Sequence, residues 1–429
     1  MSKTALACIQ CGYRTLQWVG RCPSCGAWES FVDGSVDQVA PPINLADITC
    51  DDHNRITSGI GELDRVLGGG LVAGSVVLLA GEPGIGKSTL MLQAAASMQK
   101  MGRSVLLVCG EESLEQVAAR AVRIGGVAAS AHSATDTNVI CVLMRSFEVV
   151  IVDSVQTLRE PAASGEPGSV TQVRSSAMAL SRAARESGAA VVLIGHVTKD
   201  GAVAGPRVLE HLVDAVITFE GDGGHSLRVV RSVKNRFGPS GEVGIFEMGA
   251  TGLKEIPDAS GVSLGPRRDV SGYAVGCAIE GRRPLAIEIQ SLAIESKAQL
   301  TRRVTHGIDP SRLGVLLAIL QRRAGVALAT FDVYATVAGG LRISDPGLDL
   351  AIALAAAASR RDRTITKGVA AVAEIGLGGE LRPVPGMEPR LRELTRLGFD
   401  RVIVPCETQG KDPALHRVAT LREAIEVAL

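Results

Sequence analysis

The sequence has no excess of either charge, since 45 lysines and arginines are balanced by 45 aspartates and glutamates. A strongly basic balance is the usual electrostatic footprint of a nucleic-acid-binding protein, and this footprint is missing. Binding to nucleic acid would therefore need a local cationic patch. Aromatic residues are also scarce, at 3% of the chain, and both tryptophans (Trp18 and Trp28) lie within the first thirty residues. This bias indicates that the N-terminus is a separate small module.

Long hydrophobic runs are absent as well. The N-terminus (MSKTALACIQCG) has no apolar core of signal-peptide length, and the apolar stretch around Leu350–Ala358 is too short to span a membrane. We therefore expect a cytoplasmic protein with no membrane contact, whose nine cysteines are reduced. Five isolated cysteines are expected to be buried as small hydrophobic residues: Cys50, Cys109, Cys141, Cys277 and Cys406.

Composition divides the 429 residues into three expected domains. We predict a four-cysteine module over residues 1–32, a polar linker over 33–55, an α/β domain over 56–253, a second linker over 254–270 and another α/β domain over 271–429. In the first α/β domain, apolar runs without alternation predict a parallel sheet covered on both faces, which is the doubly wound pattern. The predicted strands are Val76–Ala80, Val105–Val108, Val149–Val152, Val191–Ile194 and Val216–Phe219, and the predicted helices are Lys87–Met101, Leu114–Ile124 and Val173–Ser187.

The N-terminal module carries two CxxC pairs, Cys8/Cys11 and Cys22/Cys25, separated by ten residues. Each pair places two thiolates on one tight turn, and two such turns close a tetrahedron around Zn²⁺. A module of this size buries too little surface to fold alone, so the metal would supply the missing stability. A redox pair or incidental cysteines are the alternatives. The pattern favours a structural zinc site.

A phosphate-binding loop follows the apolar run VVLLA and precedes a predicted helix. The segment GEPGIGKST fits GxxxxGK[ST] in the expected strand–loop–helix context. Its backbone amides are expected to surround the β-phosphate of ATP, with the lysine on the β/γ oxygens and the serine on Mg²⁺. The residues assigned to this loop are Gly81, Glu82, Pro83, Gly84, Ile85, Gly86, Lys87, Ser88 and Thr89.

Carboxylates end two further predicted strands. Asp153 ends VVIVD, where a Walker B aspartate holds Mg²⁺; a helix-capping role is the alternative. Residue 154 is serine, so the catalytic glutamate of AAA+ ATPases is missing there. Glu111 or Glu112, after VLLVCG, takes the place at which RecA-type motors polarise the attacking water. We favour Glu111, with Glu112 as a solvated acid at a helix N-terminus.

With these residues in place, the chain resembles the RadA (Sms) family of bacterial DNA-repair proteins from end to end. The resemblance rests on the four-cysteine ribbon, ITSGIGELDRVLGGGLVAGS, GEPGIGKST, VDSVQT and KNRFG at Lys234–Gly238. It implies a RecA-like ATPase that assembles as a homohexameric ring and binds single-stranded and branched DNA. It also implies branch migration and heteroduplex extension alongside a strand-exchange recombinase.

The resemblance also implies roles for several single residues. His196 takes the place of a γ-phosphate sensor, with an ordinary strand-end histidine as an equal alternative. Lys234 and Arg236 take the place of a catalytic finger that acts on a neighbour's ATP, against the alternative of an exposed basic strand. Lys199, Arg207 and Arg174 are candidates for contacts to DNA phosphates, or simple surface charges.

The last domain resembles the proteolytic domain of Lon through DPGLDLAIALAAA and EIGLGGELRPVPGMEPRL. We expect strands at Leu285–Ile289 and Val402–Val404 and helices at Arg312–Arg323, Leu348–Ala358 and Pro389–Leu397. Lon uses a Ser–Lys dyad, but its serine falls on Gly347 and its lysine on Arg390.

Glycine offers no nucleophile and arginine is not deprotonated, so peptidase activity is not expected. Ser344 is a poor substitute for the nucleophile. The retained fold is expected to serve ring assembly. Its arginines are candidates for a duplex-DNA surface, or for solvated faces: Arg282, Arg283, Arg302, Arg303, Arg322 and Arg323.

Three classes of function compete for this sequence: a DNA-stimulated ATPase and translocase, an ATP-dependent Lon-type protease, and a RecA-fold signalling protein that phosphorylates itself. The missing dyad argues against the protease. Self-phosphorylating RecA-fold proteins duplicate the ATPase core, whereas this chain has one P-loop and no internal repeat. The sequence therefore favours the motor, with ATP, Mg²⁺ and Zn²⁺ as its cofactors.

Overall fold

The computed structural model describes residues 5–8, 13–15, 17–34, 55–126, 129–196, 206–221, 227–265, 269–297, 300–340, 343–410 and 412–429. The chain divides into two compact units, Met1–His53 and Asn54–Leu429. In the described part of the chain, no helix combines the length and the apolar character needed to cross a membrane.

The first unit is a small antiparallel sheet of three strands in the order β2-β1-β3. The strands are β1 (Ala5–Cys8), β2 (Arg14–Thr15) and β3 (Phe31–Gly34). Its buried centre contains Cys8, Cys22 and Phe31, with Leu6 and Val19 packed against them. The described apolar side chains are too few to stabilise a fold alone, so we expect a metal held by the cysteines to supply the missing stability.

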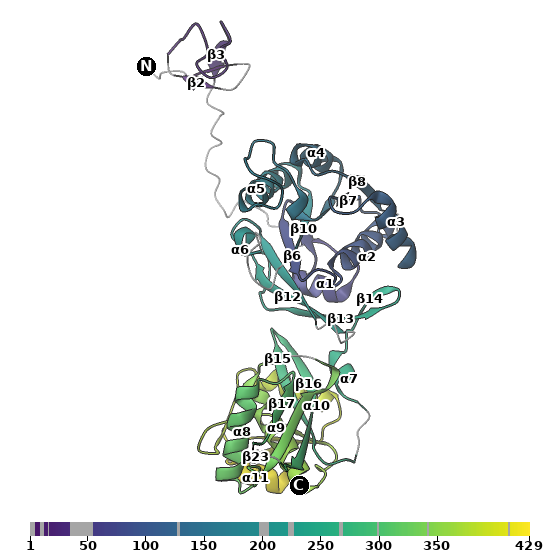
Figure 1. The fold of residues 1–429 in the computed structure, drawn as a ribbon, viewed down its shortest axis with the longest axis vertical. Helices are drawn as coiled ribbons and strands as arrows, with labels where there is room; N and C mark the ends of the chain where they lie inside the picture. The colour runs from purple at the N-terminus through teal and green to yellow at the C-terminus, as the bar shows by residue number, and fades with distance from the viewer. Residues whose placement is uncertain are drawn as a thin grey trace. The chain divides into compact units, whose positions relative to one another are not determined.

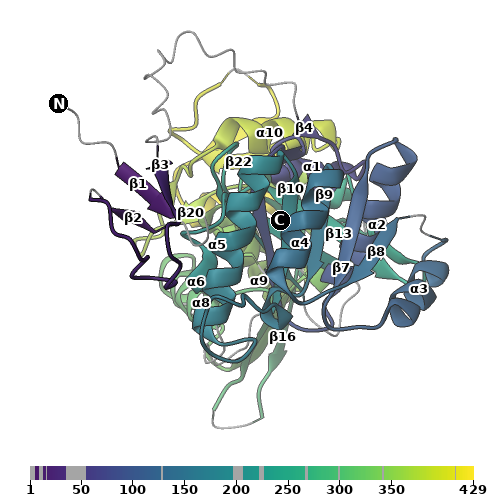
Figure 2. The ribbon, with the colours of Figure 1, turned by 90° about the horizontal axis from the view of Figure 1, so that it is seen from above.

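A nine-stranded sheet forms the first half of the second unit, in the order β14-β13-β12-β11-β6-β10-β9-β7-β8 (Figures 1 and 2). Six neighbouring strands run parallel: β6 (Val76–Gly81), β7 (Val105–Cys109), β8 (Ser130–Ser133), β9 (Val149–Asp153), β10 (Ala190–His196) and β11 (Ala215–Glu220). The remaining strands extend one edge as an antiparallel meander: β12 (Leu227–Asn235), β13 (Val243–Gly249) and β14 (Gly252–Glu255). The predicted RecA-like, doubly wound fold is confirmed.

Helices cover both faces of this sheet, and the strand residues alternate between two hydrophobic cores. Val77 and Leu79 face the core beneath α1 (Gly61–Leu67) and α2 (Lys87–Lys100). Val76 and Leu78 face the core beneath α4 (Thr137–Leu143) and α5 (Val170–Ser187). Strands that bury both faces need apolar residues at every position, which explains the missing alternation. The smaller elements here are β4 (Arg55–Ile56), β5 (Leu71–Val72), α3 (Leu114–Arg123), α6 (Pro206–Leu209) and the 3₁₀ turns η2 (Met144–Ser146) and η3 (Val155–Thr157).

The second half of this unit contains three small sheets around a buried helix. The four-stranded sheet comprises β15 (Tyr273–Glu280), β16 (Arg283–Glu295), β17 (Arg303–His306) and β18 (Phe331–Val337). The others are β19 (Val369–Ala371), β22 (Arg401–Pro405) and β23 (Leu415–Val418), and β20 (Glu374–Ile375) with β21 (Leu381–Arg382). The helices are α7 (Ala259–Ser263), α8 (Pro310–Arg323), α9 (Asp349–Arg361), α10 (Met387–Arg396) and α11 (Leu421–Ala428), with 3₁₀ turns η4 (Ala338–Gly340) and η5 (Pro346–Leu348).

Helix α9 is apolar on all sides because it lies inside this domain. Every residue from Asp349 to Ala358 is buried, and the small alanine side chains let the surrounding strands approach closely. The segment expected as a second linker contains the end of β14 and helix α7. The Ser260 hydroxyl donates to Glu393 and accepts from the amide of Ala286, so this segment packs onto the C-terminal domain.

The isolated cysteines are only partly as expected. Cys109 and Cys277 are buried, Cys141 is half-buried and Cys406 is exposed, so the expectation is wrong for Cys406. Burial raises the pKa of the Cys277 thiol to about 12, which makes it chemically inert at neutral pH. Cys50 lies outside the described residues.

A buried ion pair joins the nine-stranded sheet domain to the C-terminal domain. Glu62, on α1, is 1% exposed and accepts hydrogen bonds from the Ile245 amide at 2.9 Å and from Arg283 Nη1 at 2.5 Å. Arg283 also donates to the carbonyl oxygens of Ile256 and Pro257. The expectation that Arg283 belongs to a DNA-binding surface is therefore wrong. Its neighbour Arg282 differs, since its side chain is 69% exposed.

We predict that Glu62→Ala lowers the midpoint of thermal unfolding by on the order of 10 °C, because it leaves the Arg283 guanidinium buried without its carboxylate. Circular dichroism during heating measures this midpoint. The matched control is Glu388→Ala, since Glu388 pairs with Arg392 on an exposed helix face. Equal midpoints for the two variants would contradict a stabilising role for the buried pair.

Candidate nucleotide and metal sites

The phosphate-binding loop connects β6 to α2, as the sequence predicts. Gly84 and Gly86 have positive φ angles of 75° and 121°, and a Cβ on Gly86 would lie 2.6 Å from Met248. The backbone conformation therefore requires glycine at residue 86. Arg228, on β12, donates from Nε to the Ile85 carbonyl at 3.2 Å and so holds the loop from the meander side.

A cavity of about 380 Å³ opens at this loop. Its lining includes most of the predicted nucleotide residues: Pro83, Gly84, Gly86, Lys87, Ser88, Thr89, Glu111, Asp153 and His196. Gly81, Glu82 and Ile85 do not line it. Gly81 ends β6, Ile85 packs into the core, and the Glu82 carbonyl accepts a hydrogen bond from Lys87. Cys109, Glu112, Val117 and Arg120 complete the lining.

Four side chains, one at the start of α2 and three at or just after strand ends, form a hydrogen-bonded chain across this cavity. Lys87 Nζ donates to the carbonyls of Gly81 and Glu82 and lies 3.2 Å from His196 Nδ1. Because a lysine ammonium only donates, Nδ1 must accept, and the imidazole proton is left on Nε2. This nitrogen lies 3.4 Å from Glu111 Oε2.

Ser154 completes this chain from the end of β9. It is fully buried, and its hydroxyl donates to Glu111 Oε1 at 2.6 Å. No role was predicted for Ser154, which was noted only as the residue that replaces a glutamate. Ser154 directly follows an aspartate that ends a strand, and a glutamate lies near the end of the neighbouring strand. This arrangement is the sequence signal that could have identified Ser154 as a site residue.

The two adjacent glutamates have different partners. Glu111 is held by Ser154 and His196, whereas Glu112 forms an ion pair with Arg120 of α3. Arg120 and Val117 lie three residues apart on one face of α3, and both line the cavity. Arg120 was not among the predicted site residues; its shared helix face with Val117 is the signal that sequence offered.

Asp153 lies where a magnesium ligand is expected. Burial raises its pKa, the hydrogen bond from Ser88 opposes this shift, and the charge of Glu111 adds to it. Its Oδ1 atom is buried and has no hydrogen-bond partner among the described residues. Oxygen atoms of Glu111 and Asp153 and a nitrogen of His196 lie within 4.8 Å of one another. Two close carboxylates and an orphaned oxygen fit a hard divalent cation, with the Ser88 hydroxyl as a further oxygen ligand.

The KNRFG segment lies away from its own chain's cavity. Lys234 donates to the carbonyls of Glu210 and Val213 at 2.6 and 2.7 Å, and Arg236 pairs with Asp214 at 3.1 Å. Burial, and then the charge of Arg236, lower the pKa of Lys234. Neither cation is among the residues that line the cavity.

The candidate DNA contacts are only partly described. Lys199 lies outside the described residues, and Arg207 is in α6 but its side chain is not described. Arg174 is exposed in the first turns of α5, not in a loop. In the C-terminal domain, Arg303 donates to the backbone carbonyls of Leu328 and Phe331, so it has a structural role.

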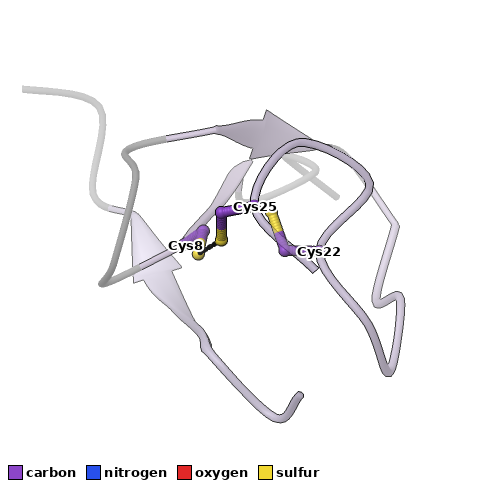
Figure 3. Close-up of side chains that lie close together, drawn as sticks. All are labelled: Cys8, Cys22 and Cys25. Atoms are coloured by element: carbon purple, nitrogen blue, oxygen red, sulfur yellow. Dashed lines mark hydrogen bonds between the residues drawn. The ribbon is translucent and has the colours of Figure 1, made fainter. Parts of the chain in front are cut away.

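The N-terminal cysteines gather at one point. Figure 3 shows Cys8, Cys22 and Cys25 converging, and the sulfur atoms of Cys8 and Cys25 are 3.7 Å apart. Tetrahedral zinc with Zn–S bonds of about 2.3 Å places its sulfurs about 3.8 Å apart, so the spacing fits the metal. All three sulfurs lie within 4.8 Å of one another. Cys11, the expected fourth ligand, lies outside the described residues.

An ion pair lies at the two positions that the resemblance to Lon aligns with its dyad. Arg390, 3% exposed, lies with Nη2 2.8 Å from Asp345 and donates from Nη1 to the Cys277 carbonyl. Asp345 also accepts from the amides of Ile279 and Gly347 at 2.6 and 2.7 Å. A Cβ on Gly347 would lie 2.6 Å from Arg390 Nη1. The arginine therefore occupies the space that a nucleophilic side chain at residue 347 would need.

The fold and the loop define a RecA-like P-loop ATPase domain, carried together with a metal-binding ribbon and a ChlI/Lon-like domain. Three family models match: the AAA domain over residues 40–202, the rubredoxin metal binding domain over 7–33, and subunit ChlI of Mg-chelatase over 334–408.

The chain belongs to the family of DNA repair protein RadA. It is 43% identical to DNA repair protein RadA of Brucella abortus over 432 residues, covering 94% of this chain and 92% of that relative. It is 39% identical to the Bacillus subtilis protein over 453 residues, covering 100% and 99%. It is 41% identical to the Synechocystis protein over 478 residues, covering 100% and 94%.

We predict that the purified chain holds one zinc ion, and that Cys22→Ser removes most of it because Cys22 is one of the clustered thiols. Metal content by plasma mass spectrometry measures this. Cys406→Ser is the matched control, since Cys406 is an exposed cysteine outside the module. Full zinc content in the Cys22 variant would exclude it as a ligand.

We predict that Gly347→Ser destabilises the C-terminal domain and gives no peptidase activity. The new Cβ overlaps the buried Arg390 guanidinium, and overpacking of this kind costs about 1–3 kcal/mol. Urea unfolding measures the loss, and casein hydrolysis tests the activity. Gly314→Ser is the control, because a Cβ on Gly314 would meet no atom within 4 Å. Detectable casein cleavage by the Gly347 variant would refute the argument from the filled site.

Proposed function

We propose that this chain is a DNA-dependent ATPase and translocase that acts in DNA repair and homologous recombination. It would work as a homohexameric ring on single-stranded and branched DNA, extending heteroduplex and driving branch migration alongside a strand-exchange recombinase. The family supports the role in DNA repair, because the relatives are DNA repair proteins. The observation that carries the motor is the chain of contacts Lys87–His196–Glu111–Ser154.

The residues of the cavity have distinct roles in this proposal. The loop amides and Lys87 bind the β- and γ-phosphates of ATP, and Ser88 and Asp153 hold the magnesium ion, which neutralises charge on those phosphates. Glu111 accepts the proton of the attacking water, while Ser154 and His196 fix the orientation of its carboxylate. The ion pair with Arg120 holds Glu112 away from this task, which favours Glu111 as the catalytic carboxylate.

His196 links the hydrolysis site to the segment that we propose contacts DNA. It is the last residue of β10, and Lys199 and Arg207, two candidate DNA contacts, follow it in the sequence. DNA bound at these residues would act on His196, which contacts both Lys87 and Glu111. Hydrolysis would therefore respond to DNA through one side chain.

Lys234 and Arg236 serve a neighbouring subunit in this proposal. They line no part of their own chain's cavity, and Arg236 is 52% exposed at its side chain. A cation supplied across a subunit interface would neutralise charge that develops on the neighbour's γ-phosphate. Self-assembly into a ring would then be a condition for hydrolysis.

The decisive experiment measures ATP hydrolysis with and without single-stranded DNA, with Lys87→Ala as the blank. We expect DNA to stimulate hydrolysis and the blank to lose it. Glu111→Gln should lower kcat at least about a hundredfold, because it removes the general base. Glu112→Gln, the matched control, should retain most of the activity.

Hydrolysis that is indifferent to DNA at low salt would refute the DNA-dependent motor and leave an ATPase with another regulator. Incubation with radiolabelled ATP distinguishes hydrolysis from self-phosphorylation. Label retained on the protein would favour self-phosphorylation, and label released as free phosphate would favour the ATPase. A larger loss in Glu112→Gln than in Glu111→Gln would reverse the assignment of the catalytic carboxylate.

A further inference from the structure

The N-terminal unit exposes aromatic side chains, although the chain has few of them. Tyr13, Trp18 and Trp28 are 41%, 59% and 72% exposed. These two indoles are the only tryptophans among the 429 residues. Tryptophan is a costly residue to leave in water and is typical of binding surfaces. Both tryptophans therefore need a reason to lie on the smallest unit of the protein.

Contacts within the unit hold each indole in place while leaving its surface open. The Trp18 ring packs edge-on against the buried Phe31, with ring centroids 6.4 Å apart. Trp28 is bridged to Arg21 across an antiparallel pair, and the guanidinium lies 5.8 Å from the ring centroid. Arg21 is itself fixed by a hydrogen bond from Nε to the Gly26 carbonyl at 3.1 Å. Little conformational entropy remains to be lost when a ligand binds to rings held in this way.

We propose that Trp18 and Trp28 form a stacking surface for the bases of single-stranded DNA, with Arg21 as its cation. This inference rests on the proposed function, which makes DNA the substrate, and assigns part of that substrate to the zinc-binding unit. Flat π faces beside an arginine are the combination by which proteins bind unpaired bases without sequence preference.

The surroundings of the rings favour DNA over a protein partner. Among the described residues of this unit, the large hydrophobic side chains that are exposed are all aromatic, and no exposed leucine, isoleucine, valine or methionine extends the surface. Protein interfaces bury anchor residues within a continuous apolar patch, and no described residue of this unit extends these rings into such a patch. A separate aromatic ring face can stack on a single unpaired base.

Stacking also answers the difficulty raised by the charge balance. The chain has a formal net charge of zero, so counterion release along a broad basic surface is a weak source of affinity. Base stacking contributes about 1–3 kcal/mol per base and does not depend on net charge. Stacking on the aromatic side chains of the N-terminal unit would supply affinity for DNA that the cations of the chain do not.

The position of the tryptophans makes the test direct, because the intrinsic tryptophan fluorescence of the full-length, zinc-loaded protein reports only on this unit. We expect a thymidine oligonucleotide to quench this emission on binding. An abasic oligonucleotide of equal length should bind through its phosphates and leave the emission nearly unchanged. DNA binding shown by fluorescence anisotropy of a labelled strand, with no change in tryptophan emission, would overturn the proposal.

Substitutions provide the second arm. Trp28→Leu should weaken binding of single-stranded DNA about tenfold, while Trp28→Phe should retain most of it because a π face remains. Zinc content verifies that each variant keeps its fold. Leu377→Ala is the control, since Leu377 is a 74% exposed apolar residue of the C-terminal domain. Unchanged DNA affinity in a Trp18→Leu/Trp28→Leu variant would overturn the proposal.

The outcome is separable from that of the proposed function. If DNA stimulates hydrolysis by the unaltered chain but the indoles neither quench nor contribute affinity, the motor stands and the stacking surface fails. If DNA stimulates no hydrolysis yet still quenches the indoles, the stacking surface stands and the DNA-dependent motor fails.

Discussion

The hydrolysis site depends on the close approach of two strand ends. Gly110, directly after β7, donates its amide to the Asp153 carbonyl at the end of β9 with an N–O distance of 2.7 Å. A side chain at residue 110 would overlap the Thr157 hydroxyl, so the approach is open only to glycine. This contact places Glu111 beside Asp153 and within reach of the buried Ser154 hydroxyl. This backbone contact between the two strand ends therefore positions the catalytic groups of the proposed ATPase.

Most of the ATPase domain was predictable because its signals are local. Unbroken apolar runs predicted β6, β7, β9, β10 and β11, and the loop motif has a fixed spacing between strand and helix. The antiparallel meander β12–β14 was not predicted as such, because its strands carry mixed burial on a sheet edge and lack the apolar signature. The parallel direction of the strands, by contrast, follows from the doubly wound pattern.

The individual partners of site residues were the part that sequence alone did not predict. Glu111 and Glu112 are adjacent, and only their three-dimensional neighbours separate them: Ser154 lies 43 residues from Glu111 along the chain. Likewise, Arg283 is indistinguishable from Arg282 in composition, yet one is buried against Glu62 and the other is exposed. Contacts between residues far apart in sequence depend on strand order and packing angle, which no short motif encodes.

The C-terminal domain has a ChlI/Lon-like architecture. An ion pair fills the space at the positions that the resemblance to Lon aligns with its dyad. Once Arg390 fills that space, its charge has to be matched, and Asp345 matches it while also holding the backbone of Ile279 and Gly347. A lysine would reach fewer of these acceptors, and a serine at residue 347 would not fit beside the guanidinium. The identities of residues 347 and 390 are therefore coupled, because a side chain added at one overlaps the guanidinium of the other. The buried Glu62–Arg283 pair joins this domain to the ATPase domain.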